Sequence, residues 1–322
     1  MLARHNSAMI ARLFMALLAL AVLLPGAARG QPEDPAWAQD RRLAIVAERL
    51  LGANVALCRS TMPLTGLILH SADQYAQPPA AWFANGPIAV AQVLPGSPAE
   101  QAGIRPGDGV QAIAGLAVDA LAPAAGYPLR DAVFDQITRA SAPLTMQLQR
   151  TGRSEAVAIT APTGCRALVE VLTGNGMLAQ SDGRVIQISY AMATALNDDE
   201  LAAVFAHELA HLVLDHNRRL LEAGVGNGLA QEFGRSRRFA RQAEVAADRL
   251  SVHLLAEAGL DPQIAPQLWE GDAGRAVAND LLRSRRYPSR RERARLMRQE
   301  IADYLPAGPA HLLAGRDQPF AD

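Results

Sequence analysis

Apolar positions follow two different patterns along the chain. From Ser60 to about Pro162, short apolar runs alternate with Gly- and Pro-containing turns, which is typical of a small β-rich domain. Elsewhere the apolar stretches are longer and predict helices. The sequence therefore predicts an α+β fold that is mainly helical and carries a β-rich insertion. The expected strands are residues 66–69, 88–93, 109–113, 144–148, 156–160 and 185–189, and the expected helices are residues 40–51, 197–216, 242–258 and most of 279–304.

The predicted helix at residues 197–216 is apolar on nearly all sides, so we expect it to be buried. It contains His207, Glu208 and His211, which are costly to bury unless a partner compensates them. A metal ion is the compensation we expect, because residues four apart lie on one helix face and both imidazoles can bind one ion. Glu208 lies about 100° round the helix from His207. This H-E-x-x-H pattern is typical of zinc peptidases.

A catalytic zinc site needs a third protein ligand and one open position. His216 is nine residues after His207, about 180° round a continuous helix, so it is expected to point away, at the surface or behind the ligands. Glu244 and Asp248 lie four apart on the helix predicted at residues 242–258. We assign Glu244 as the third ligand and Asp248 as the acceptor that orients a ligand histidine. The alternative is a pair of surface carboxylates beside the arginines of that helix.

Residues 199–211 and 244–250, with the Ala-Gly-Leu-Asp-Pro run at 258–262, resemble peptidase family M48. The two stretches correspond to that family's H-E-x-x-H and E-x-x-x-D elements, and the resemblance extends from Cys165 to about Ile301. It implies a zincin-type metallopeptidase domain with one Zn²⁺ per chain, bound by His207, His211 and Glu244. It also implies that Glu208 is the catalytic base.

The resemblance further implies a substrate-aligning edge strand at residues 175–179, which includes Asn175, Gly176 and Met177. One position departs from the family pattern. Where the family usually has a late Thr-His-Pro element, this chain has Arg-Tyr-Pro, with Tyr287 in place of the histidine. Tyr287 either donates a hydrogen bond to the developing oxyanion or is a structural aromatic.

Within the β-rich region, the Gly-Ser-Pro-Ala run at residues 96–99 and Pro-Gly-Asp at 106–108 resemble a PDZ domain of the bacterial protease type. The resemblance covers about residues 61–161. It implies that Thr65, Gly66, Leu67 and Ile68 form the loop whose backbone amides hold a peptide C-terminus, with the peptide added as a strand. Such a domain would recruit or gate substrate chains, and the alternative is a spacer or lid.

The N-terminus predicts export. Arg4 and Arg12 precede the apolar run at residues 13–24, and the small residues around Gly30 fit a signal-peptide cleavage site. We expect a periplasmic protein cleaved near Gly30, with an uncleaved anchor as the alternative. In an oxidising compartment Cys58 and Cys165 are expected to form a disulfide at the base of the insertion, rather than remain two buried thiols.

These observations divide the chain into a signal peptide (1–30), an N-terminal helical segment (31–58), a PDZ-like domain (59–163), a metallopeptidase domain (164–305) and a C-terminal tail (306–322). Residues 220–241 are expected to form a partly helical connection beside the site. The formal net charge of −1 gives no support for nucleic-acid binding. The mature chain has no predicted transmembrane segment, although it could lie close to a membrane. The expected function is a zinc endopeptidase that cleaves misfolded or unassembled envelope polypeptides. The alternative is an envelope chaperone or assembly adaptor that keeps the zinc site but rarely cleaves.

Overall fold

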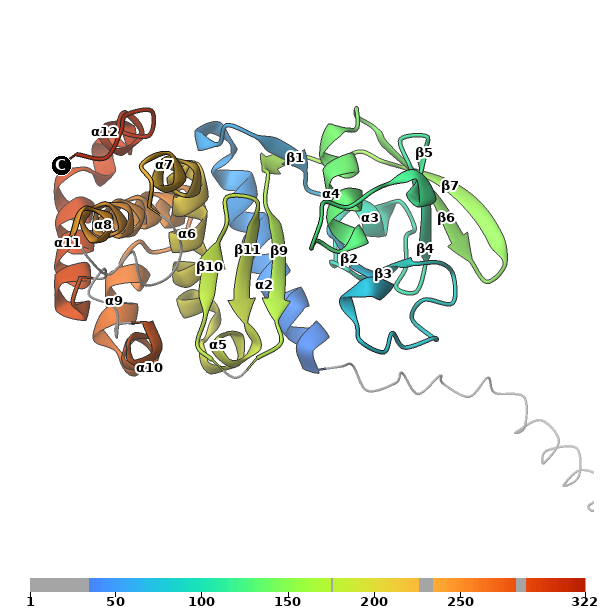
Figure 1. The fold of residues 1–322 in the computed structure, drawn as a ribbon, viewed down its shortest axis with the longest axis horizontal. Helices are drawn as coiled ribbons and strands as arrows, with labels where there is room; N and C mark the ends of the chain where they lie inside the picture. The colour runs from blue at the N-terminus through green and yellow to red at the C-terminus, as the bar shows by residue number, and fades with distance from the viewer. Residues whose placement is uncertain (1–34, 175, 226–233, 282–287, 322) are drawn as a thin grey trace, which may run out of the picture. The chain divides into compact units, whose positions relative to one another are not determined.

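The computed structural model describes residues 35–174, 176–225, 234–281 and 288–321, which belong to one compact unit (Figure 1). Its fold is α+β, as predicted. The helices are α2 (Pro35–Ala53), α3 (Pro98–Gln101), α4 (Leu129–Arg139), α5 (Tyr190–Ala195), α6 (Asp198–Val213), α7 (His216–Glu222), α8 (Gly234–Glu257), α9 (Ile264–Glu270), α10 (Asp272–Leu281), α11 (Arg290–Asp303) and α12 (Ala310–Leu313). The strands are β1 (Thr61–Pro63), β2 (Leu67–Ser71), β3 (Ile88–Val93), β4 (Gly109–Ile113), β5 (Leu116–Ala117), β6 (Leu144–Arg150), β7 (Arg153–Ile159), β8 (Thr163–Cys165), β9 (Leu168–Leu172), β10 (Ala179–Ser181) and β11 (Val185–Ser189).

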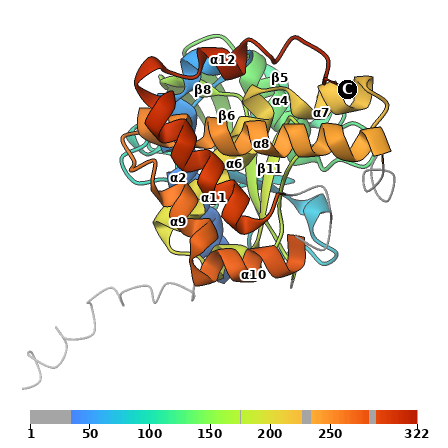
Figure 2. The ribbon, with the colours of Figure 1, turned by 90° about the vertical axis from the view of Figure 1, so that its left-hand side faces the viewer.

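The helical part is built around α6, whose start is encoded locally. Asn197 accepts a hydrogen bond from the Glu200 amide, and the Glu200 side chain accepts one from the Asn197 amide, forming a capping box. Residues along α6 are almost all buried, in one hydrophobic cluster with α2, α8, α9 and α11. Figure 2 shows α8 and α11 together on the face opposite the strands. Helix α8 begins at Gly234, well before the predicted start at Gln242, because Phe239 and Ala240 in its first turns are buried.

A three-stranded sheet with the order β10-β11-β9 packs beside α2 and α6. Strand β11 pairs with β9 in parallel and with β10 in antiparallel fashion, so β10 is an edge strand. Asp182 begins the tight turn of the β10–β11 hairpin. This sheet brings a free strand edge to the side of α6.

The β-rich part has its own core and a six-stranded sheet in which β2-β3-β4-β6-β7 are ordered neighbours and β5 pairs with β4. The chain leaves α2 through β1 and returns through β8, and these two strands pair antiparallel. Cys58 and Cys165 form a disulfide beside this pair, with their Cα atoms 5.5 Å apart. The two ends of the β-rich part are therefore tied together where it joins the helical part.

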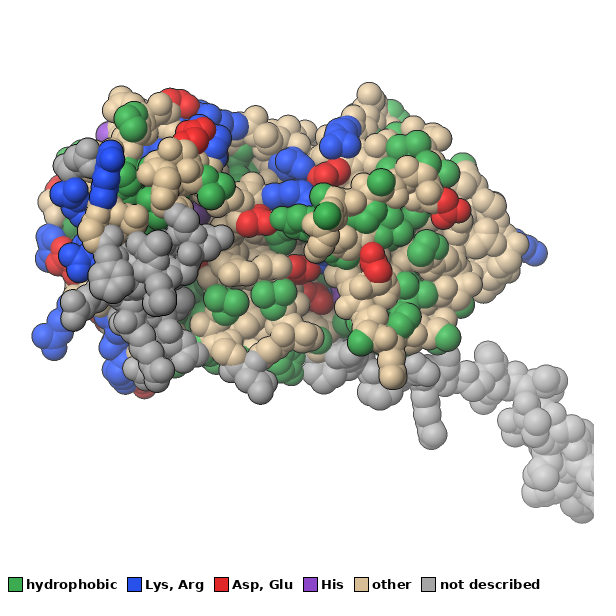
Figure 3. All heavy atoms as spheres, in the orientation of Figure 1, with side chains coloured by type: hydrophobic (Ala, Val, Ile, Leu, Met, Phe, Trp, Pro, Cys, Tyr) green, Lys and Arg blue, Asp and Glu red, His purple; other side chains and the backbone are tan. Residues whose placement is uncertain are grey.

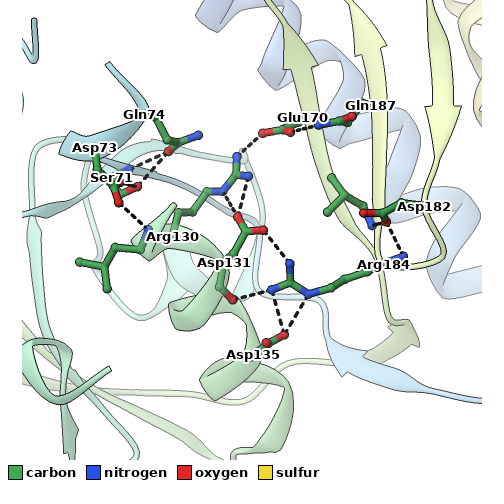
Figure 4. Close-up of polar contacts among 12 residues, drawn as sticks. Ser71, Asp73, Gln74, Arg130, Asp131, Asp135, Glu170, Asp182, Arg184 and Gln187 are labelled. Carbon is green, nitrogen blue, oxygen red and sulfur yellow. Dashed lines mark hydrogen bonds and ion pairs between the residues drawn. The ribbon is translucent and has the colours of Figure 1, made fainter. Parts of the chain in front are cut away.

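An ion-pair network joins α4 of the β-rich part to the three-stranded sheet (Figure 4). Arg130 pairs with Asp131 beside it and with Glu170 on β9. Arg184 from the hairpin turn pairs with Asp131 at 2.6 Å and with Asp135 at 3.2 Å. In Figure 3, arginine and acidic side chains gather where α4 meets this sheet. Since Arg130 and Asp131 are buried, the network fixes the β-rich part against the sheet.

The C-terminal residues do not form the loose tail that the sequence suggested. Helix α12 follows a 3₁₀ turn at Leu305–Ala307, and the chain then returns to α7 and α8. There Phe320 is buried against Phe239 with stacked rings 5.5 Å apart. The sequence offered little signal for this contact, because a single aromatic residue near a terminus has no periodicity. Among the described residues, no helix has both the length and the apolar character needed to span a bilayer.

Candidate active site

The three predicted ligands converge between α6 and α8. The Nε2 atoms of His207 and His211 are 3.1 Å apart. Glu244 on α8 places Oε2 3.4 Å from His207 Nε2 and Oε1 3.8 Å from His211 Nε2. All three ligand atoms lie within 4.8 Å of one another, and no other His, Cys, Asp or Glu group of this kind occurs in the described residues. The arrangement arises because α6 and α8 pack closely along their lengths.

These residues fit a zinc ion. Two imidazoles and one carboxylate form a donor set found in catalytic zinc sites, which keep a fourth position open. Glu244 Oε2 is buried and makes no hydrogen bond, although it lies close to His207. A buried carboxylate oxygen without a hydrogen bond is costly unless a cation compensates it. The geometry therefore supports a metal as the missing partner.

Asp248 lies behind the ligands, one turn after Glu244 on α8. Its Oδ1 is 3.1 Å from His207 Nδ1, so the carboxylate can hold the imidazole with Nε2 toward the metal. Arg293 from α11 donates hydrogen bonds from two of its nitrogens to the Asp248 carboxylate. Its guanidinium carbon lies 3.7 Å from the centre of the Trp269 ring. Burial opposes ionisation of Asp248, but Arg293 outweighs it and keeps the pKa of that carboxyl below its ordinary value. Sequence reasoning missed Arg293, because an arginine in an arginine-rich helix is usually solvated.

Charges in the site are arranged around Glu244. Burial raises the pKa of Glu244, but the two neighbouring histidines outweigh burial and lower it, so this side chain stays a carboxylate. Glu208 differs because burial outweighs the opposing effect of its neighbours. Burial raises its pKa to about 7, although His207 and Arg293 lower it, and Glu244 adds to the increase. A carboxyl group with this pKa can accept and return a proton near neutral pH.

The ligands and Glu208 line a cavity of about 290 Å³ between α6, α8 and the edge strand. Residues 178–181 form one wall of it. The edge strand begins at Ala179, so the substrate strand predicted over residues 175–179 overlaps it only at its last residue. Gly176 and Met177 precede the strand. Glycine at residue 176 weakens strand formation, and Met177 packs against the core. Asn175 lies outside the described residues.

His216 lies closer to the site than the helical angle predicted. Helix α6 ends at Val213, and Asp215 adopts a left-handed conformation (φ 56°) that starts α7 in a new direction. This turn places His216 Nδ1 3.0 Å from His211 Nδ1. The predicted orientation of His216 was wrong because it assumed that one continuous helix extends to residue 216. His253 points elsewhere, toward Glu300.

In the β-rich part, the predicted peptide-binding loop is engaged by the chain itself. The Gly66 amide donates to Glu48 Oε1 of α2 at 2.7 Å, and Thr65 is buried. Gly66 has a φ of 75°, and a Cβ on it would lie 2.1 Å from the Ser97 Cβ, so only glycine fits there. Leu67 and Ile68 begin β2, an edge strand of the six-stranded sheet. Tyr287, the suggested oxyanion donor, lies outside the described residues.

The HExxH helix, β10 and β11 lie within the segment that matches a known family. Residues 173–233 match the model of peptidase family M48. The chain is 28% identical over 148 residues to "Mitochondrial metalloendopeptidase OMA1" of Schizosaccharomyces pombe, an alignment covering 38% of this chain and 42% of that protein. It is 27% identical over 136 residues to the protein of the same name from Arabidopsis thaliana, covering 36% of this chain and 27% of that protein. The chain thus spans less than half the length of either relative. Together the M48 match and these relatives support a metallopeptidase role.

Proposed function

We propose that this chain is a zinc metalloendopeptidase in which His207, His211 and Glu244 hold one Zn²⁺. The observation that carries the proposal is the convergence of these three ligand atoms beside buried Glu208 in a cavity open to solvent. The M48 match over residues 173–233 supports the same reaction class.

Each residue has a role that follows from its position. A bound zinc would act as a Lewis acid toward water and the scissile carbonyl. Glu208 lies beside the ligands in the cavity wall, where it can accept a proton from the attacking water and deliver it to the leaving amine. Asp248 fixes the ring of His207 through Nδ1, and Arg293 keeps Asp248 ionised and immobile.

An extended substrate would add to the sheet along the free edge of β10. The Asp182 amide donates to the Val185 carbonyl, and the Ser189 amide donates to the Leu178 carbonyl. In an antiparallel pair, hydrogen-bonded and non-hydrogen-bonded residue pairs alternate, so Gln180 and Gln187 form the hydrogen-bonded pair between them. Ala179 and Ser181 then direct their backbone polar groups to the free edge. Ser181 also lines the cavity.

Two variants test the chemistry and the substrate strand separately. Glu208→Gln should abolish casein cleavage while zinc content stays at one per chain. Equal cleavage by wild type and Glu208→Gln would refute the protease proposal and favour the alternative, an envelope chaperone or assembly adaptor. Ser181→Pro should lower kcat/KM at unchanged zinc content, because proline removes a free-edge N–H that the hairpin does not use. The matched control Ser181→Ala should cleave normally, and equal loss in both would contradict strand addition.

The proposal extends to location and substrate. We place the mature protein in the periplasm after cleavage near Gly30, acting on misfolded or unassembled envelope polypeptides. The disulfide supports an oxidising compartment. The mass of the chain purified from the envelope fraction tests the cleavage site. A full-length mass would favour the uncleaved anchor.

The β-rich part is proposed to gate the site as a PDZ-like module. A peptide carboxylate that used the Gly66 amide would have to replace Glu48, because Glu48 already accepts that hydrogen bond. Recruitment would then compete with this contact between the β-rich part and α2. Casein cleavage by a Glu48→Ala variant tests the gate, and an unchanged rate would favour a spacer.

A further inference from the structure

His216 is a buried histidine that the proposed chemistry does not use. Its side chain is 1% exposed, and its Nε2 atom has no hydrogen-bond partner among the described residues. A buried donor without a hydrogen-bond partner is costly, so an apolar residue would pack there more favourably. The other ring nitrogen, Nδ1, lies 3.0 Å from Nδ1 of His211. The structure therefore retains an imidazole at this position at a cost in stability.

The tautomers of the two rings follow from the ligand geometry. His211 directs Nε2 toward His207 and Glu244, so Nε2 must be free of a proton to bind a metal. Its proton is then on Nδ1, and His216 Nδ1 is the acceptor. A ligand histidine is commonly fixed in this way by a hydrogen bond to its second nitrogen. His207 has a carboxylate in the equivalent position, Asp248, so each imidazole ligand has its own acceptor.

His216 is held from behind by the C-terminal segment. The Phe320 ring lies 6.2 Å from the His216 ring, and the Arg219 guanidinium lies 4.2 Å from the centre of the Phe320 ring. The Gln242 amide group binds the Ala321 backbone twice, accepting from its nitrogen at 3.2 Å and donating to its oxygen at 2.7 Å. Phe320 forms a small separate cluster with Val225, Phe239 and Ala243. This segment thus closes the space in which His216 could otherwise rotate.

We propose that His216 is a positioning residue for His211, and that Phe320 of the C-terminal segment holds His216 in place. This inference rests on the proposed zinc site. The positioning acts on the metal ligand and not on the substrate, so it should appear first in zinc affinity. Residues at the far end of the chain would then contribute to metal binding.

The test measures zinc affinity of the full chain by competition with a chromophoric chelator. His216→Leu fills similar space without an acceptor and should weaken zinc binding about 10–100-fold. His216→Gln restores an acceptor oxygen and should recover most of the loss, which a purely structural role would not predict. Phe320→Ala should weaken binding several-fold, whereas Phe320→Leu should bind nearly as wild type. Unfolding curves of the metal-free proteins establish that the compared variants are folded.

The outcomes separate this inference from the proposed function. If wild type bound no zinc, the proposed function itself would fail. If wild type bound zinc and folded His216→Leu bound it equally well, the positioning role would be wrong. Equal affinity of Phe320→Ala and wild type would overturn the role of the C-terminal segment. Should His216→Leu not fold, Phe320→Ala and Gln242→Ala test the inference without changing His216, because neither residue contacts a ligand. Weaker zinc binding by either folded variant would support it, and wild-type affinity of both would overturn it.

Discussion

Replacing Arg293 with methionine should destabilise the protein by about 3–5 kcal/mol. Arg293 is 1% exposed and Asp248 is fully buried, so neither charge is solvated. The pair is bidentate, with Nε 2.7 Å from Oδ2. Removing one partner of a buried pair leaves the other charge without compensation, which costs about 3–5 kcal/mol. Methionine also loses the cation–π contact with Trp269, whereas the contact of Asp248 with His207 remains and offsets part of the loss, so the expected value stays within that range.

A double-mutant cycle isolates the pair. Asp248→Asn alone should cost a similar amount, because it leaves Arg293 buried and charged. In the double variant neither charge remains, so its loss should be smaller than the sum of the single losses by about 2–3 kcal/mol. Urea unfolding followed by circular dichroism measures each value, with a chelator present so that metal binding does not contribute.

Arg298→Met is the matched control. Arg298 lies on the same helix and pairs with Glu270, but both side chains are about half exposed. Its loss should cost less than about 1 kcal/mol. If Arg293→Met were as mild as this control, or if the two single effects simply added, the account of Arg293 as an essential buried counter-charge would be wrong.

Three further predictions concern stability. The double variant Cys58→Ala/Cys165→Ala removes a cross-link over 107 residues and should lower the unfolding free energy, measured by urea titration, by about 4–5 kcal/mol. A loss under about 1 kcal/mol would argue against the chain-entropy estimate. Asn197→Ala removes the α6 cap and should cost about 1 kcal/mol by the same assay, whereas no change would mean that the capping box is dispensable. Burial raises the pKa of Glu48 more than the Gly66 amide lowers it. The Glu48 carboxylate therefore binds a proton more readily in the native state than in the unfolded state. Ionised Glu48 thus destabilises the native state at neutral pH. Glu48→Gln should therefore be more stable than wild type at neutral pH, and this difference should shrink as the pH falls through the raised pKa toward and below 4.5; a pH-independent difference would contradict the assignment.

Several strands and the start of α6 were the most predictable parts of the fold. The bounds of β3, β4 and β11 agree with the predicted residues 88–93, 109–113 and 185–189, because glycine, proline or aspartate marks their ends. The start of α6 was equally clear, since Asn197 and Glu200 form the cap by themselves. These features depend on neighbouring residues only, so a single sequence contains the information.

The features that sequence reasoning missed depend on contacts between distant segments. Arg293 acquires its role only when α11 packs on α8 and brings it to Asp248. His216 turns toward His211 because Asp215 interrupts the helix, and aspartate tolerates a left-handed conformation without requiring it. Phe320 is buried by residues about 80 and 100 positions earlier, Phe239 and Arg219. The periodicity of apolar residues along the sequence does not predict such contacts.

The paired strands β1 and β8, with the Cys58–Cys165 bridge beside them, make the β-rich part a covalently closed loop. A single cut by a protease anywhere between these cysteines would leave both fragments bonded to each other. Electrophoresis would then show one band of unchanged mass without reductant and two bands with it. Nicked molecules would keep α2 attached to α6, so damage to the β-rich part need not release the zinc ligands from their supporting helix.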